Sequence, residues 1–324
     1  MAILPATPDA IRRAAAILRA GGLVAFPTET VYGLGANALS PEACAWVFAA
    51  KKRPSFDPLI VHVDDHRTLA AVCDFRDPRA QKLAAAFWPG PLTLVVPKTD
   101  AVPDIVTSGL PTVAVRRPAH PVARALLAES ALPIAAPSAN PFGYISPTLA
   151  EHVEKMLGGE VELVLDGGAC TVGVESTIID VSGERPVLLR PGAIPAERIE
   201  ALVGPLGRPE PAGLPRAPGQ LASHYAPRTR LVLVERGAGV VSAGERAGLL
   251  AFGEPLKARA TTYAAVETLS RSGDLLEAAV NLFACLHRLD AQGLDVIHAE
   301  RVPAEGLGAA IGDRLRRAEA ARHA

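Results

Sequence analysis

The sequence predicts an α/β fold: an N-terminal twisted mixed sheet flanked by helices, followed by a smaller Rossmann-like β/α domain. Short apolar runs alternate with helical patterns through the first 200 residues, which is typical of a sheet covered by helices. A segment rich in proline and glycine then interrupts this pattern, and strands and helices resume after it. The chain has 324 residues, which is enough for two domains of ordinary size.

The expected strands of the first domain are short runs of aliphatic and β-branched residues bounded by turn residues. Their irregular spacing and some very short connections favour a mixed sheet over a purely parallel one. The runs are Leu23–Phe26, Leu59–Val63, Leu92–Val96, Thr112–Val115, Ile134–Ala136, Leu163–Leu165, Thr177–Val181 and Val187–Leu189.

Helical patterns separate several of these runs. At the N-terminus, Thr7 can cap a helix whose first position is Pro8, so we expect the chain to begin with a helix. A further helix is expected to end near Lys51. The other apolar-periodic segments are Ala10–Arg19, Arg79–Phe87, Val122–Glu129 and Leu149–Leu157.

Residues 204–227 contain six prolines and four glycines, a composition that continues neither a helix nor a central strand. We therefore expect an extended linker there, which divides the chain into domains at 1–203 and 228–324. Beyond the linker, an apolar stripe from Leu275 to Leu289 predicts an amphipathic helix. The remaining elements are expected to be strands at Leu231–Val234, Gly248–Phe252 and Asp295–His298 and a closing helix at Ala309–Ala321.

Composition excludes several classes of protein. Lys plus Arg is 33 and Asp plus Glu is 34, and aromatic residues are only 4%, which disfavours an extensive nucleic-acid surface. The four cysteines have no CxxC spacing, so they indicate a reducing cytoplasm rather than a zinc ribbon or a redox dithiol. The longest charge-free run, residues 131–150, contains four prolines and is not expected to span a membrane.

The common nucleotide and metal motifs are missing from the sequence. It has no GxxxxGK[ST] loop, and no GxGxxG follows the first predicted strand. His62 and His66 are four residues apart, but His62 falls in a predicted strand, so the two do not share a helix face. We therefore predict no metal site built by protein ligands.

Polar clusters interrupt the apolar runs at the ends of the predicted elements. Taken singly, each is explained by turn chemistry, a helix cap or a solvated arginine. Arg53, Arg116 and Arg190 recur in such places with proline close behind, and strand-end guanidiniums suit phosphate and carboxylate groups. The residues alone thus indicate a cleft for a phosphate compound and a small polar acid, without a P-loop.

At these clusters the sequence resembles the YrdC-domain family, the L-threonylcarbamoyladenylate synthases of tRNA modification. His224-Tyr225-Ala226-Pro227, followed by a β/α domain, resembles the long two-domain form of that family. Departures are local: Asp57 stands where Asn is frequent, Gln220 where Met is usual, and Pro141-Phe142 where small polar residues are usual. The matching segments are PTETVYGLG at 27–35, Lys51 and Arg53, WPGPLT at 88–93, TVAVRRP at 112–118, PSAN at 137–140, SPT at 146–148, GVEST at 173–177, LRPG at 189–192 and GLGAAIGDRLRRA at 306–318.

The resemblance implies a cytoplasmic nucleotidyltransferase that makes threonylcarbamoyl-AMP and pyrophosphate from L-threonine, bicarbonate and ATP with Mg²⁺. A downstream threonylcarbamoyl transferase would place the product on adenosine 37 of tRNA. It also implies that residues 1–203 are the YrdC-like catalytic domain and that the linker acts as a lid over the active site. The resemblance also implies weak binding of RNA. It implies no interaction with a membrane.

Carried over residue by residue, the resemblance implies two sets of contacts and a catalytic group. Lys51, Arg53 and Arg190 would offset the repulsion between carbamate and phosphate and stabilise the transferring group. Arg116 would hold the threonine carboxylate, and no general base is obvious. The implied L-threonine contacts are Thr30, His62, Arg116, Ala136 and Ser176, and the implied ATP contacts are Arg53, Asp57, Thr112, Ser138, Asn140, Ser146, Arg190 and Tyr225.

The sequence leaves two alternative functions open. YrdC-like folds can present a basic concave face, so a module that binds double-stranded RNA or tRNA is an alternative; a salt-dependent gel shift without ATP turnover would support it. Carbamoyltransferases of the hydrogenase-maturation type also contain a YrdC-like domain. They carry zinc-finger cysteine pairs and an acylphosphatase domain, which this sequence lacks.

Overall fold

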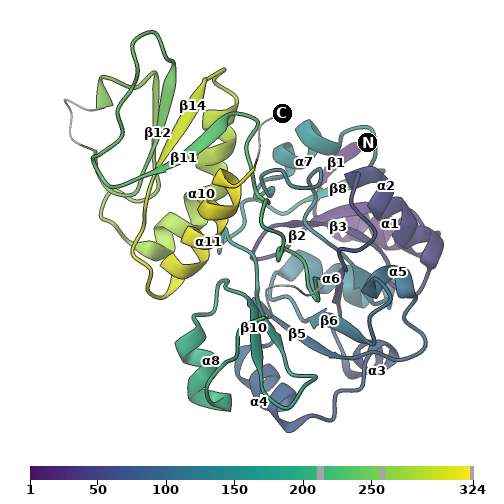
Figure 1. Ribbon diagram of the computed structural model, residues 1–324. Coiled ribbons are helices and arrows are strands. Elements are labelled where there is room, and N and C mark those ends of the chain that lie inside the picture. Colours follow the sequence, from purple (N-terminus) through teal and green to yellow (C-terminus); the bar gives the residue numbers. More distant parts are fainter. Residues whose placement is uncertain (210–214, 256–259, 322–324) are drawn as a thin grey trace.

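The structure, a computed structural model, describes residues 1–209, 215–255 and 260–321 (Figure 1). Residues 210–214 of the predicted linker and residues 256–259 and 322–324 of the predicted second domain lie outside the described residues. The described residues form two sheets, one of ten strands and one of four. The predicted domain boundaries themselves stay predictions.

The larger sheet is mixed, as predicted, with the strand order β1-β8-β2-β3-β7-β4-β6-β5-β9-β10. Parallel pairs such as β4 with β6 stand beside antiparallel pairs such as β5 with β6. All eight predicted strands of this sheet are present with ends shifted by a residue or so. The strands are β1 (Ala2–Pro5), β2 (Val24–Pro27), β3 (Tyr32–Asn37), β4 (Ile60–His62), β5 (Leu92–Pro97), β6 (Thr112–Arg116), β7 (Ile134–Ala135), β8 (Leu163–Asp166), β9 (Thr177–Asp180) and β10 (Val187–Arg190).

Two strands of the larger sheet were not predicted from the sequence, for different reasons. Strand β1 precedes the first helix, so the expectation that the chain begins with a helix is wrong; four residues before the Thr7 cap are too few for a periodic signal. Strand β3 contains Gly33 and Gly35, which disguise it as a loop. A Cβ at Gly35 would lie 2.8 Å from the Phe26 ring, so glycine is needed for the close packing of β3 on β2.

Helices of the first part begin at clear sequence signals. The Thr7 side chain accepts the Ala10 N–H at the start of the first helix, and Asp77 caps the fourth in the same way. Three of the helices, α3, α5 and α8, were not predicted. The helices are α1 (Pro8–Arg19), α2 (Pro41–Lys51), α3 (His66–Val72), α4 (Pro78–Phe87), α5 (Asp104–Thr107), α6 (Pro121–Ser130), α7 (Ala150–Leu157) and α8 (Ala196–Val203).

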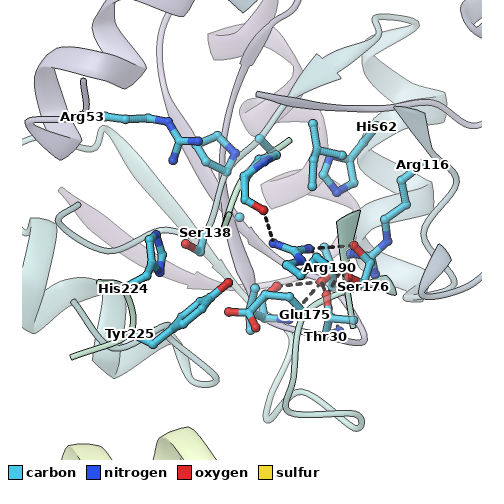
Figure 2. Close-up of a pocket in the computed structure, with 18 residues that line it drawn as sticks. Thr30, Arg53, His62, Arg116, Ser138, Glu175, Ser176, Arg190, His224 and Tyr225 are labelled. Atoms are coloured by element: carbon cyan, nitrogen blue, oxygen red, sulfur yellow. Dashed lines mark hydrogen bonds between the residues drawn. The ribbon is translucent and has the colours of Figure 1, made fainter. Parts of the chain in front are cut away.

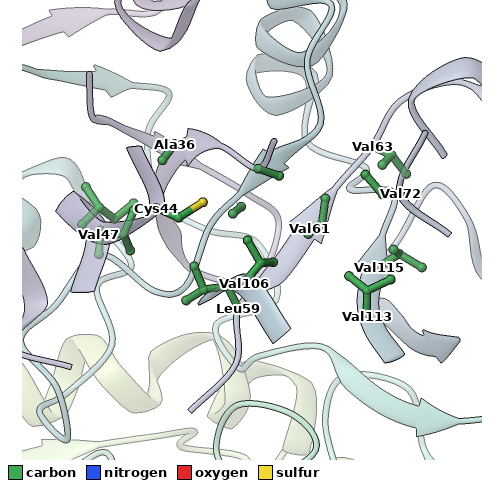
Figure 3. Close-up of a cluster of buried hydrophobic side chains, with 14 of the residues drawn as sticks. Ala36, Cys44, Val47, Leu59, Val61, Val63, Val72, Val106, Val113 and Val115 are labelled. Carbon is green, nitrogen blue, oxygen red and sulfur yellow. The ribbon is translucent and has the colours of Figure 1, made fainter. Parts of the chain in front are cut away.

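Strand alternation divides the side chains of the large sheet between two faces. On one face, Val61, Val63 and Val115 join the main apolar core with residues of α2 such as Cys44 and Val47 (Figure 3). The other face is covered at one end by α1 and α6, whose apolar residues pack on β2 and β8. Between those helices and the sheet's far end, this second face carries polar side chains, and the candidate site lies there.

The smaller sheet is entirely parallel, as a Rossmann-like β/α domain requires, with the order β11-β14-β12-β13. Strand β13 was not predicted. The closing helix begins two residues earlier than expected. The elements are β11 (Arg230–Val234), β12 (Ala247–Ala251), β13 (Ala265–Thr268), β14 (Val296–Glu300), α10 (Leu275–Asp290) and α11 (Leu307–Glu319).

The two sheets are joined through a shared apolar cluster. Leu282 and Phe283 of α10 and Ile311 of α11 pack with Val31, Val174 and Tyr225, which belong to the first 227 residues. Figure 1 shows α10 and α11 on the side of the small domain that faces the large one. Among the described residues, no helix is long and apolar enough to cross a membrane.

Candidate active site

A small buried cavity lies on the polar part of the large sheet's second face. It encloses about 40 Å³, and its walls come from β3, β4, β6, β10, the loops around 28–31, 136–138 and 175–176, and the segment 218–225. The lining residues are Thr28, Thr30, Val31, Gly33, Arg53, Ile60, His62, Arg116, Ala136, Pro137, Ser138, Glu175, Ser176, Arg190, Pro218, Gly219, His224 and Tyr225.

The cavity brings together most of the residues singled out from the sequence. Figure 2 shows Arg53, His224 and Tyr225 on one side, His62 and Arg116 on the other, and Arg190 between them. The candidates that line the cavity are Thr30, Arg53, His62, Arg116, Ala136, Ser138, Ser176, Arg190 and Tyr225; those that do not are Lys51, Asp57, Thr112, Asn140 and Ser146.

Lys51 and Asn140 support the wall of the cavity from behind. The Lys51 ammonium donates to the backbone oxygen of Ser138 at 2.5 Å and to that of Asn140. The Asn140 amide donates to the backbone oxygens of Pro141 (2.8 Å) and Tyr144 (3.0 Å). Both side chains therefore fix the shape of the loop that carries Ser138, and burial lowers the pKa of Lys51.

The other three candidates outside the lining differ in their distance from it. Asp57 pairs with Arg53 (Oδ2 to Nη2, 2.9 Å), and the Ser146 hydroxyl donates to Glu175 Oε1 at 2.6 Å, so each touches a lining residue. Thr112 begins β6, at the end of that strand opposite Arg116. Within the described residues, Thr112 is therefore the candidate that makes no contact with the cavity.

On the Arg116 side, polar groups cluster around one guanidinium. Arg116 pairs with Glu29 (Nη2 to Oε1, 2.7 Å) and donates from Nη1 to the Thr30 hydroxyl at 2.9 Å. Burial, assisted by the charge of Arg116, lowers the pKa of His62 to about 3, so this ring is neutral. Glu29 was not singled out from the sequence, although it stands inside the PTETVYGLG segment.

Arg190 is bound differently from the other buried arginines. It donates from Nε to Ser176 O (3.1 Å), from Nη2 to Ser176 O and Oγ (3.0 and 3.1 Å), and from Nη1 to Pro218 O (3.3 Å). Within residues 1–209, 215–255 and 260–321, no carboxylate forms an ion pair with it. Arg53, Arg116 and Arg314, by contrast, each have a carboxylate partner.

A buried ion pair between Glu175 and Arg314 joins the second sheet's last helix to the cavity. Arg314 donates from Nε to Glu175 Oε2 at 2.7 Å and from Nη1 to the Pro191 oxygen at 2.9 Å. Burial raises the pKa of Glu175, but Arg314, Arg190 and the Ser146 hydroxyl outweigh it and hold that pKa below its usual value.

Sequence reasoning missed Arg314, although a signal for it exists. It occupies a position of the apolar stripe of α11, three residues after Ile311 and four before Ala318, and all three are buried. An arginine within the buried stripe of an amphipathic helix needs an anionic partner.

The segment 215–227 forms part of the cavity wall through Pro218, Gly219, His224 and Tyr225. Arg216 pairs with the buried Asp180 (2.6 Å), and Ala217 is fully buried against apolar residues of β4, β5 and β9. Gly219 has φ +82°, and a Cβ there would lie 2.5 Å from the Tyr225 hydroxyl and 3.0 Å from Arg190. At the other end, Tyr225 is 1% exposed, and the Arg314 guanidinium lies 4.9 Å from the centre of its ring.

Comparisons with known families and proteins match nearly the whole chain. The family described as "Telomere recombination", which groups Sua5, YciO and YrdC, matches residues 16–192. The family described as "Threonylcarbamoyl-AMP synthase, C-terminal domain" matches residues 194–320. A Pyrococcus abyssi threonylcarbamoyl-AMP synthase is 44% identical over 95% of this chain and 93% of its own length. One from Bacillus subtilis is 43% identical over 96% and 93%.

Solved structures give the same match in three dimensions. The crystal structure of P. abyssi Sua5 complexed with L-threonine covers 98% of each chain with a TM-score of 0.91 and 41% identity. A variant of that protein in which a histidine and the tyrosine after it are both replaced by alanine gives a TM-score of 0.89 at 40% identity, over 98% of this chain and 96% of its own.

Proposed function

Because the chain belongs to the Sua5/YciO/YrdC family of threonylcarbamoyl-AMP synthases in its two-domain form, we propose that it joins L-threonine, bicarbonate and ATP into threonylcarbamoyl-AMP and pyrophosphate. The observation that carries this proposal is Arg190, a buried guanidinium with no carboxylate partner among the described residues, next to the segment that closes the cavity. An unpaired buried cation requires an anion, and a phosphate of ATP supplies it.

The Arg116 side of the cavity is the proposed threonine site. Arg116 offers a guanidinium to the amino acid's carboxylate, and Thr30 and Ser176 offer hydroxyls of the kind that recognises a hydroxyl. Glu29 already holds one edge of Arg116, so the guanidinium is oriented before the substrate arrives. The neutral His62 ring can accept or donate a hydrogen bond there without adding charge. Ala136 limits the size of the substrate's side chain.

The other side is the proposed nucleotide site. Arg53, Ser138, Arg190 and Tyr225 line it, and Asp57 and Ser146 contact lining residues. Lys51 and Asn140 are positioning residues in this proposal, because their polar groups are committed to the loop that carries Ser138. Thr112 joins the site only in an opened state.

The reaction joins two anions. The threonine amine adds to bicarbonate with loss of water to give a carbamate, and a carbamate oxygen then attacks the α-phosphorus. The bond from that phosphorus to the oxygen leading to the β-phosphate breaks, and pyrophosphate leaves. Arg53 and Arg190 reduce the repulsion between the anions and stabilise charge on the transferring group, so catalysis rests on positioning and electrostatics.

Mg²⁺ would enter on the phosphates of ATP rather than in a site made by the protein. Among the described residues, no cluster of three or more histidine, cysteine, aspartate or glutamate side chains could hold a metal ion. Phosphate oxygens are the ligands with which Mg²⁺ is usually bound in nucleotide-using enzymes. The ion would neutralise the leaving pyrophosphate.

The segment 215–227 is the proposed lid. The cavity has room for a few water molecules and not for ATP, so this segment must move for the nucleotide to enter. Closed again, it would exclude water from a mixed anhydride that water destroys. The product's proposed use is transfer by a second enzyme to adenosine 37 of tRNA in the cytoplasm.

Pyrophosphate release from the purified protein tests the function. We expect release from ATP and bicarbonate to depend on L-threonine, and valine, which lacks the hydroxyl, to support it at least a hundredfold less well. Labelled bicarbonate should appear in the adenylate product. Release that is independent of the amino acid, or equal with valine and threonine, would contradict the proposed substrate.

A further inference from the structure

Two oppositely charged side chains line the same part of the cavity without pairing. Figure 2 shows Glu175, Ser176 and Arg190 together there, yet no ion pair joins Glu175 to Arg190 in the described parts of the chain. The two carboxylate oxygens of Glu175 are engaged elsewhere. Oε1 accepts from the Ser146 hydroxyl at 2.6 Å, and Oε2 accepts from Arg314 at 2.7 Å.

We propose that Arg314, contributed by the second domain, is a positioning residue that binds Glu175 and so keeps Arg190 free for the phosphates of ATP. The proposal rests on the proposed function, because it assigns to α11 a role at the same nucleotide site. It gives the second domain a part in the reaction that does not require it to touch a substrate.

The geometry makes Arg314 suited to this role. Its side chain is fully buried, and its guanidinium is fixed by Glu175, by Asp313 at 2.8 Å and by the Pro191 oxygen at 2.9 Å. Pro191 directly follows Arg190, so the same side chain holds both the carboxylate and the backbone beside the cation. A fixed guanidinium directs two donors at chosen acceptors, which a flexible ammonium does less well.

Electrostatics predicts what happens when Arg314 is removed. Glu175 is buried, and an unpaired buried carboxylate is costly. Arg190 lines the same part of the cavity as Glu175, and its charge also lowers the pKa of Glu175, so it is the expected replacement partner. Pairing with Glu175 would neutralise the anion site from within the protein. ATP and pyrophosphate would then bind weakly, whereas threonine, on the Arg116 side, would bind as before.

The test compares Arg314→Gln, Glu175→Gln and the double variant, with Arg316→Gln as the control on an exposed position of the same helix. We measure KM for ATP and for threonine, and calorimetric binding of inorganic pyrophosphate. In Arg314→Gln we expect KM for ATP and the pyrophosphate Kd to rise at least tenfold, with KM for threonine within twofold. The double variant, which has no carboxylate to compete for Arg190, should recover most of this loss.

A double variant that binds pyrophosphate no better than Arg314→Gln would overturn the proposal, as would a parallel rise in both KM values. Should Arg314→Gln unfold, which a thermal melt reveals, Glu175→Gln alone decides. We expect it to bind pyrophosphate at least as tightly as the unmodified protein, and a tenfold weakening would refute the role. Wild-type release of pyrophosphate that ignores threonine would instead reject the proposed function.

Discussion

At the scale of single residues, four buried arginines define what the cavity can bind. Arg53, Arg116 and Arg314 are each balanced by a carboxylate, whereas Arg190 has no carboxylate partner in the described part of the chain and donates to the oxygens of Ser176 and Pro218. Neutral oxygens orient a guanidinium without cancelling its charge. The difference therefore marks the position at which an anionic ligand gains most.

Replacing Arg190 tests this directly. We expect Arg190→Gln to weaken pyrophosphate binding at least tenfold and to leave threonine binding within twofold, because the amide keeps part of the hydrogen bonding to Ser176 without the charge. Calorimetry with each ligand measures both effects. Arg185→Gln, at an exposed position in the turn before β10, is the control. Equal binding of pyrophosphate by Arg190→Gln and by the control would show that Arg190 is a structural arginine.

Only some of the buried charged residues at this site could be predicted from the sequence. Strand-end arginines followed by proline could be recognised from their position alone. Glu175 and Arg314 could not be paired in advance, because they are 139 residues apart, one in the loop before β9 and the other in helix α11. The spacing of residues along the sequence does not reveal an ion-pair partner that comes from another domain. An arginine in the buried stripe of α11 does indicate that such a partner exists.

At the scale of elements, the segment 215–227 depends on one glycine. Gly219 has a positive φ and is in close contact with Tyr225 and Arg190, so a side chain there is both strained and obstructed. We expect Gly219→Ala to prevent full closure and to shorten the lifetime of the adenylate product severalfold. A chromatographic time course of product hydrolysis on the enzyme measures this.

Gly204→Ala is a matched control for that experiment. Gly204 has the same φ of +82°, but an added Cβ would meet nothing within 4 Å. Both changes should cost stability by roughly 1–3 kcal/mol for the backbone strain. If the two variants lose product protection equally, strain rather than the contact with Tyr225 and Arg190 is responsible.

Helices and strands were predicted correctly where the apolar period and the capping residues agreed. They were missed where the element is short. The capped helices α1, α4 and α6 and the β-branched strands were predicted within a few residues. Helix α5 has four residues and α3 seven, too few to repeat an apolar period. Strand β13, Ala265–Thr268, is half-buried and mixed in composition, so neither alternation nor an apolar run identifies it.

At the scale of the whole molecule, the two domains meet through paired rings as well as charges. His152 of α7 and His287 of α10 are stacked with centroids 4.0 Å apart. His287 Nε2 contacts the Ser146 oxygen at 3.2 Å, and His152 Nδ1 accepts the Thr148 N–H at 3.3 Å. The pair thus holds the loop whose Ser146 hydroxyl reaches Glu175.

Acid should weaken this contact. Burial lowers the pKa of His152 to about 3, and the charges of Lys155 and Arg288 also lower it. Burial lowers the pKa of His287 to about 4; Lys155 lowers this pKa as well, whereas Asp290 raises it. Below about pH 6.5 the unfolded chain binds more protons than the native one, so stability is complete above that pH and declines as the pH falls. Between that pH and its native pKa, each histidine contributes a loss that approaches about 1.4 kcal/mol per pH unit.

Urea unfolding at pH 7.5 and pH 5 measures the effect. We expect a lower midpoint at pH 5, and a smaller difference between the two pH values in His152→Phe, which keeps a stacked ring but cannot be protonated. His66→Phe, at an exposed position, is the control. An unchanged pH dependence in His152→Phe would show that other groups dominate acid unfolding.

The position of Arg314 in α11, after every strand of both sheets, has a consequence for how the protein is made. A ribosome releases the ten-stranded sheet long before it reaches this helix, yet that sheet's nucleotide cavity still lacks the cation that balances Glu175. A nascent chain, or one cut short by a premature stop codon before α11, would lack Arg314, so Glu175 would pair with Arg190 instead and the Tyr225 ring would lose its cation partner. ATP would therefore bind weakly until the last helix has docked, so the end of translation would set when the full activity appears.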